Sequence, residues 1–206
     1  MPSTMASTTR CLPSLSEALR SLAGLCLACC LTALAHAGDA TEVKNASVVA
    51  TAQGYQLDAE LSLAPNPTLV DALERGVHLH FLLELDISRP RGWWWFDENI
   101  ASPTRKLHLY YHLLLRRYVV ETGYTTRTVA SLADALALLG RVDDWQILER
   151  GALKPGQRYD ARLRLRLDTT QLPKTLSIGA VTSDKWALAT PWHSWSFEAP
   201  ALPSQP

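Results

Sequence analysis

Four histidines form two pairs that could bind a metal ion. His78 and His80 are two residues apart, and His108 and His112 are four apart. Side chains two apart on a strand point to one face, so neighbouring strands would let three imidazoles build an open Zn²⁺ site. Glu84 could then act as a ligand or as a general base. Outward-facing histidines on strands are also common without any ligand, and we expect no cofactor in this protein.

The densest basic feature is an alternating ladder of three arginines, Arg162, Arg164 and Arg166. Three guanidinium groups on one face could bind a phosphate, a lipid headgroup or an acidic partner. They could also form cross-strand ion pairs with the carboxylates of Glu60, Glu84 or Asp86, each contributing about 0.2–1 kcal/mol. The aspartates on both sides of the ladder, Asp160 and Asp168, favour the ion-paired alternative.

Tryptophan is the third notable residue type. All seven tryptophans follow residue 37, and three of them are consecutive at 93–95. Adjacent residues of a strand face opposite ways, so both faces cannot bury indole equally. An exposed Trp93 or Trp94 beside Arg91 would suit a protein interface or stacking on a sugar ring. The alternative is that all indoles are buried in the core.

These residues must be positioned mainly by β-strands, because apolar and polar residues alternate with period two. The alternation predicts long strands over 43–52, 55–63, 77–88, 106–116 and 159–168. Shorter strands are expected around 93–98, 118–122, 145–150, 176–181 and 192–197. One apolar and one polar face per strand indicates antiparallel sheets rather than a parallel α/β sheet.

Two short helices are expected between the strands. Asn66 and Pro67 predict a helix start, and Gly76 predicts its end after Arg75. Ser131 caps a second helix that runs to Leu139, with Gly140 beyond it. We therefore expect a mainly β protein, an antiparallel β-sandwich with two short helices in connecting loops.

The N-terminus is typical of an export signal. Arg10 and Arg20 supply positive charge, residues 21–35 are uncharged and mostly apolar, and Ala35-His36-Ala37 fits a signal peptidase site. We expect cleavage between Ala37 and Gly38, a β-sandwich domain over 38–199 and a flexible tail over 200–206. The alternative is that the segment is retained as a membrane anchor, although about 20 apolar residues are needed to span a bilayer.

Composition, charge and the lack of known catalytic motifs argue against several functional classes of protein. The chain has 206 residues with 20 basic and 20 acidic side chains, and this balance argues against a nucleic-acid binder. All four cysteines precede residue 38, so the expected mature chain has no disulfide. It also has no second apolar run long enough to cross a membrane. The acid pairs Asp97-Glu98 and Asp143-Asp144 are expected in solvated turns. The sequence has no nucleophile elbow, zinc-protease, phosphate-loop or dinucleotide-binding motif.

A family resemblance rests on several segments in order. They are Arg91 to Glu98, Leu109 to Tyr118, Ser131-Leu132 with Ala135-Leu136, Leu172-Pro173-Lys174, Asp184-Lys185-Trp186, and Trp192 with Trp195. Over about residues 40–198 the chain resembles the bacterial exported domain-of-unknown-function family numbered 4390. The resemblance implies a periplasmic or envelope setting and a gene neighbourhood with a two-component sensor. It implies no catalytic residue.

These observations favour a non-enzymatic periplasmic protein that binds a partner, with a membrane-embedded sensor as one candidate partner. A small-ligand module for sugar or lipid, using exposed Trp and Arg, is the second alternative. A metal-dependent hydrolase built on the histidine pairs is the third.

Overall fold

The computed structural model describes residues 40–91, 97–173 and 186–203. The chain divides into two units, Met1–Gly38 and Asp39–Pro206, and all described residues belong to the second. The expected signal peptide, the run of tryptophans at 93–95 and the expected strand at 176–181 lie outside the described residues.

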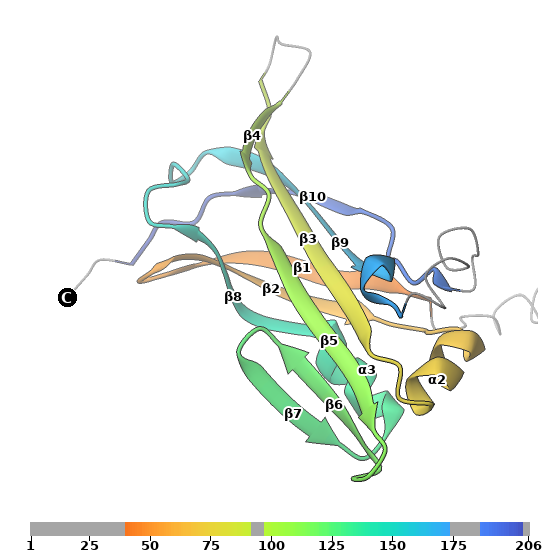
Figure 1. The fold of residues 1–206 in the computed structure, drawn as a ribbon. Coiled ribbons are helices and arrows are strands. Elements are labelled where there is room, and N and C mark those ends of the chain that lie inside the picture. The colour runs from red at the N-terminus through yellow and green to blue at the C-terminus, as the bar shows by residue number, and fades with distance from the viewer. Residues whose placement is uncertain (1–39, 92–96, 174–185, 204–206) are drawn as a thin grey trace, which may run out of the picture. The chain divides into compact units, whose positions relative to one another are not determined.

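Two antiparallel sheets make up the described part (Figure 1). The smaller sheet has the order β1-β2-β8, and the larger has the order β10-β9-β3-β5-β6-β7, with β4 paired to β3. The strands are β1 (Glu42–Thr51), β2 (Gly54–Ser62), β3 (Leu79–Arg89), β4 (Glu98–Ala101), β5 (Thr104–His112), β6 (Arg117–Thr122), β7 (Thr125–Val129), β8 (Arg141–Glu149), β9 (Arg158–Leu167) and β10 (His193–Glu198). The prediction of a mainly β, antiparallel sandwich is confirmed.

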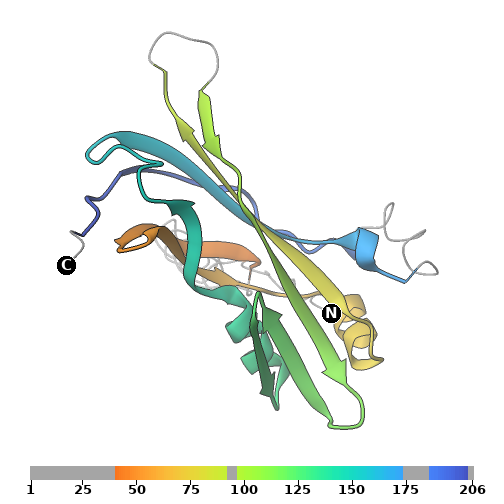
Figure 2. The ribbon, with the colours of Figure 1, turned by 60° about the vertical axis from the view of Figure 1, so that its left-hand side comes forward.

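One cluster of buried apolar side chains includes residues of both sheets. Figure 2 shows the ribbons of these sheets from a second side. Strand β1 contacts β9 and β10, while helix α3 (Leu132–Gly140) contacts strands of both sheets, namely β2 and β8 on one side and β5, β6 and β7 on the other. The alternating residues that the sequence assigned to the interior are buried, for example Leu83 and Leu85 on β3 and Leu163 and Leu165 on β9. The inner face of the large sheet is therefore used for packing, which leaves its outer face for function.

The two predicted helices are present. In α2 (Pro67–Glu74) the Asn66 side chain accepts a hydrogen bond from the Leu69 amide, and Gly76 follows with φ of +85°. In α3 the Ser131 side chain accepts from the Asp134 amide. Gly140 is the last residue of α3 rather than lying beyond it. A Cβ there would lie 2.3 Å from the Leu61 carbonyl oxygen, so only glycine fits.

The strand predicted over 106–116 ends early, at His112. Residues Leu113–Arg116 form the turn that joins β5 to β6, and Arg116 adopts a φ of +50°. Leu113 and Leu115 therefore do not continue the buried face of the strand. Strand β7 and a short 3-10 helix at Thr169–Gln171 were not predicted.

Among the residues that the structure describes, no helix combines the length and the apolar character needed to cross a membrane.

Candidate functional site

The outer face of the large sheet carries the arginine ladder. Strand β9 pairs with β3 in a register that places Arg162 opposite Asp86 and Arg164 opposite Glu84. Directly opposed residues in an antiparallel pair point to the same face. Because Leu83, Leu85 and their β9 counterparts fill the core, the charged residues between them must face outward.

Each arginine of the ladder is ion-paired on this face. Arg162 Nη2 lies 2.9 Å from Asp86 Oδ2, and Arg164 Nε lies 2.6 Å from Glu84 Oε2. Arg166 Nη2 lies 2.9 Å from the other Glu84 oxygen, Oε1. Three guanidinium groups thus share two carboxylates, and Asp160 at the start of β9 adds a further carboxylate beside Arg162. The cross-strand ion pairs that the sequence favoured are present, with Glu84 and Asp86 as the partners.

Glu84 is the centre of this network. Burial raises the pKa of its carboxyl group, but hydrogen bonds from Arg166 and Arg164 outweigh burial and hold the pKa below its usual 4.5. Glu84 therefore stays ionised wherever the protein is folded near neutral pH. Its side chain is 19% exposed, and Arg162 at the end of the ladder is 56% exposed.

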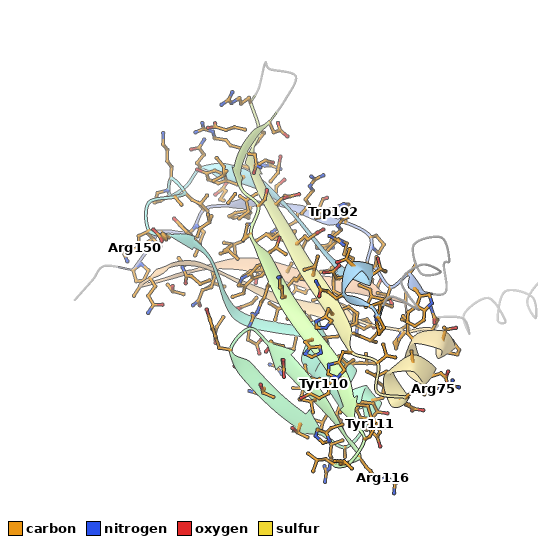
Figure 3. The ribbon with its side chains drawn as sticks, viewed as in Figure 1. Arg75, Tyr110, Tyr111, Arg116, Arg150 and Trp192 are labelled. Carbon is orange, nitrogen blue, oxygen red and sulfur yellow. The ribbon has the colours of Figure 1, made fainter. Side chains whose placement is uncertain are left out.

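A tryptophan lies over the ladder. The guanidinium carbons of Arg162 and Arg164 lie 4.7 Å and 4.3 Å from the ring centre of Trp192 (Figure 3). Trp192 immediately precedes β10, whose Ser194 pairs with Arg162, so continuing this register places Trp192 beside Arg164. Sequence reasoning missed this contact, because it requires knowing that β10 is the neighbour of β9.

The histidine cluster occupies the neighbouring part of the same face, and consists of His78, His80, His108, Tyr110 and Glu121. His108 Nε2 lies 3.0 Å from His78 Nδ1, and its Nδ1 lies 3.0 Å from Glu121 Oε2. The rings of His80 and His108 stack at 4.2 Å, and those of His78 and Tyr110 at 4.5 Å. In one consistent tautomer, His108 donates to Glu121 and accepts from His78.

Burial and the neighbouring His108 lower the pKa of both His78 and His80 below 6.5. The charge of Glu121 raises the pKa of both rings, and that of Asp168 raises the pKa of His80, but these effects are smaller. The neutral form of the stacked rings is favoured as a result.

The structure brings three of the four candidate histidines together but leaves His112 apart, where its Nδ1 accepts from the Leu115 amide at 3.3 Å. Within the described ranges, no three His, Cys, Asp or Glu side chains are grouped to hold a metal ion.

The remaining candidates lie at the β3–β4 end of the sheet. Arg91 Nη2 lies 3.0 Å from Glu98 Oε2, and Arg89 pairs with the same carboxylate. Trp93 and Trp94 lie outside the described residues. Asp97 and Glu98 were expected in a solvated turn. Glu98 instead begins β4 and forms ion pairs with Arg89 and Arg91.

Two spaces in the protein differ in what they could hold. An open hollow of about 620 Å³ beside the ladder is lined by residues that include Asp86, Asp160, Arg162, Ser194 and Trp195. The apolar space between the two helices and the large sheet measures only about 10 Å³, which is too small for a lipid tail. Of these two spaces, only the surface hollow has room for a small ligand.

The comparisons with known proteins give one match. The family described as Domain of unknown function (DUF4390) matches residues 38–196. No curated protein and no solved structure shows a significant match to the chain. Since the matched segment covers most of the chain and contains both sheets except for the last two residues of β10, the chain belongs to the DUF4390 family.

Proposed function

We propose that this protein is exported to the bacterial envelope, where it acts as a non-catalytic binding protein whose contact surface is the arginine ladder with Trp192. The observation that carries the proposal is the stacking of two ladder guanidinium groups on the Trp192 ring. Arginine and tryptophan are the residues most enriched among those that dominate protein interfaces.

The ladder is suited to a protein partner because it is held in place before binding. Glu84 and Asp86 fix the guanidinium groups, and the rigid strand pair β3–β9 fixes the carboxylates. Side chains that are already ordered lose little conformational entropy on association. The alternation of arginines and carboxylates on this face favours a partner surface with charges of both signs in complementary positions.

Site-specific photo-crosslinking in cells tests this surface. A photoreactive residue at exposed Ser194, beside Arg162, is expected to join one discrete protein, whereas the same residue at exposed Ser47 on β1 is not. Arg162→Glu is expected to lower the Ser194 adduct by at least about tenfold at an unchanged melting temperature. Identical adducts from both positions, or a yield that Arg162→Glu leaves unaltered, would contradict the proposal.

Export rests on the leader pattern of residues 1–37, and a membrane-embedded sensor is the partner class that the family resemblance suggests. Intact-mass analysis of the protein from cells tests export. A mature chain that begins at Gly38 is expected, and an uncleaved chain found in the cytoplasm would overturn this part of the proposal.

A second candidate function, binding of a sugar, is favoured by the hollow beside the ladder. Its volume of about 620 Å³ suits a small ligand, and its carboxylate, hydroxyl and arginine groups suit sugar hydroxyls. Thermal unfolding with chitotriose tests it. Saturation at 100 times Kd would stabilise the protein by about 2.7 kcal/mol, and Ser194→Trp, which fills the hollow, should abolish the shift.

A further inference from the structure

Three consecutive leucines are exposed at the end of one hairpin. Leu113, Leu114 and Leu115 are 58%, 91% and 62% exposed, and we call them the leucine tip. Across the described ranges, the only other exposed large apolar side chains are Val49, which is 40% exposed, and Tyr124, and each stands singly. Single exposed apolar residues are ordinary, but a contiguous group indicates a contact with something outside the chain.

The leucine tip is held in a defined conformation. The Leu115 amide donates to His112 Nδ1 at 3.3 Å, and at the base of the hairpin the rings of Tyr111 and Tyr118 pack 4.8 Å apart. Leu113 lies against the turn after α2, where a Cβ on Gly76 would come within 3.3 Å of its Cδ1 atom. Binding through the tip would therefore require little additional ordering.

Two basic side chains adjoin the leucine tip in the chain, and a third lies at the same end of the sheet. Arg116 and Arg117 follow it directly and are exposed, and Arg75 at the end of α2 lies at the same end of the sheet (Figure 3). Arg75 pairs with Asp71 at 3.0 Å, whereas no carboxylate of the described residues forms an ion pair with Arg116 or Arg117. Apolar side chains beside unpaired arginines complement a bilayer with anionic headgroups.

We propose that the leucine tip docks on the surface of an anionic phospholipid bilayer. The leucine side chains enter the boundary between headgroups and acyl chains, and Arg116 and Arg117 contact lipid phosphates. A bilayer fits better than a protein, because a stable protein interface buries more than about 1,000 Å² with good complementarity and three side chains on a narrow turn cannot supply it. This inference concerns a surface separate from the arginine ladder.

Photo-crosslinking to vesicles tests the inference with the complete purified chain. A benzophenone residue is placed by Leu114→p-benzoylphenylalanine, and vesicles contain phosphatidylethanolamine and phosphatidylglycerol in a ratio of 3 to 1. The matched control is Tyr124→p-benzoylphenylalanine, because Tyr124 is fully exposed in the turn at the opposite end of β6. Mass spectrometry of the modified peptide is expected to show at least about fivefold more lipid adduct at 114 than at 124.

Two variants separate the apolar and the charged contributions. Replacing both flanking leucines, Leu113→Ser with Leu115→Ser, should lower the adduct at 114 by at least about tenfold, since both substitutions remove apolar surface that leaves water on docking. Arg116→Glu with Arg117→Glu should lower it by a similar factor, as should vesicles of phosphatidylcholine alone. Equal lipid yields at 114 and 124 would overturn the proposal. So would a protein adduct in place of a lipid adduct when the same probe is irradiated in cells.

Discussion

The arginine ladder and the leucine tip belong to the same sheet but satisfy their side chains in opposite ways. On the ladder, every guanidinium group has a carboxylate partner within the chain, and Trp192 covers two of them. At the tip, three consecutive leucine side chains are more than half exposed. A paired polar surface is stable in water by itself, whereas clustered exposed leucines favour aggregation unless something outside the chain covers them.

Ion pairs within a chain are compatible with a binding role, but a group of exposed apolar side chains is the stronger sign of one. The binding role that we propose for the ladder would use the same contacts that stabilise the strand pair, since the carboxylates of Glu84 and Asp86 also fix the positions of the arginines. The leucine tip has no comparable pairing, because its three side chains stay more than half exposed, although Leu113 lies against Gly76.

Removing the Glu84 carboxylate should leave two ladder arginines without their ion-pair partner, which reduces the contrast with the exposed leucines of the tip. Glu84→Ala leaves Arg164 and Arg166 facing each other without an anion, and should lower the free energy of unfolding by about 1–2 kcal/mol. Chemical denaturation measures this change. The matched control Glu60→Ala, on β2 and exposed, should alter stability by less than about 0.5 kcal/mol. Equal effects at the two positions would mean that the ladder pairs contribute nothing.

The same carboxylate predicts an acid dependence of stability. Because the pKa of Glu84 is depressed in the folded protein, the unfolded state binds its proton at higher pH. Stability from this group is therefore complete above pH 4.5 and is lost as pH falls from there through the folded pKa. Glu84→Gln should flatten this part of the curve of unfolding free energy against pH, and an unchanged curve would show that another carboxylate is responsible.

A smaller effect is expected from the histidine cluster at higher pH. Burial and His108 lower the pKa of His78 and His80, so the unfolded state takes up protons first as pH falls. The free energy of unfolding should thus decrease as pH drops from 6.5 through the folded pKa values, even though Glu121 and Asp168 oppose part of the shift. His78→Gln with His80→Gln should remove this decrease, whereas His112→Gln, outside the cluster, should retain it.

The smallest change in stability is expected at the leucine tip. Leu114 is 91% exposed, so Leu114→Ser should alter the free energy of unfolding by less than about 0.5 kcal/mol. Leu109 on the adjoining strand is 1% exposed, and Leu109→Ala should cost about 2–5 kcal/mol. A large loss from Leu114→Ser would show that the tip has an internal packing role and would weaken the contrast with the ladder.

Most strands could be predicted from the sequence because burial of one face imposes period-two alternation. Strands β2, β3 and β9 alternate without interruption, and their apolar residues are buried as expected. The prediction from sequence failed where a strand has no apolar face or where a turn lacks the residues that usually mark one. Strand β7 (Thr125–Val129) is almost wholly exposed and has no apolar face, and the turn at Leu113–Arg116 contains no Gly, Pro or Asn to mark it.

The candidate site could be predicted only in part, because strand order is not encoded locally. The sequence proposed Glu60, Glu84 and Asp86 as partners for the ladder but could not choose among them. The choice depends on β3 lying beside β9, which is far from it along the chain. The same limit applies to the stacking of His80 on His108 and of Trp192 on the ladder.

Hydrogen–deuterium exchange of the complete chain, with and without phosphatidylethanolamine–phosphatidylglycerol vesicles, tests the contrast between the two surfaces most directly. The account predicts that vesicles slow exchange of the backbone amides of residues 113–117 and leave those of β9 unchanged. Protection of β9 with none at 113–117 would contradict it, because the lipid would then be meeting the arginine ladder and not the exposed leucines.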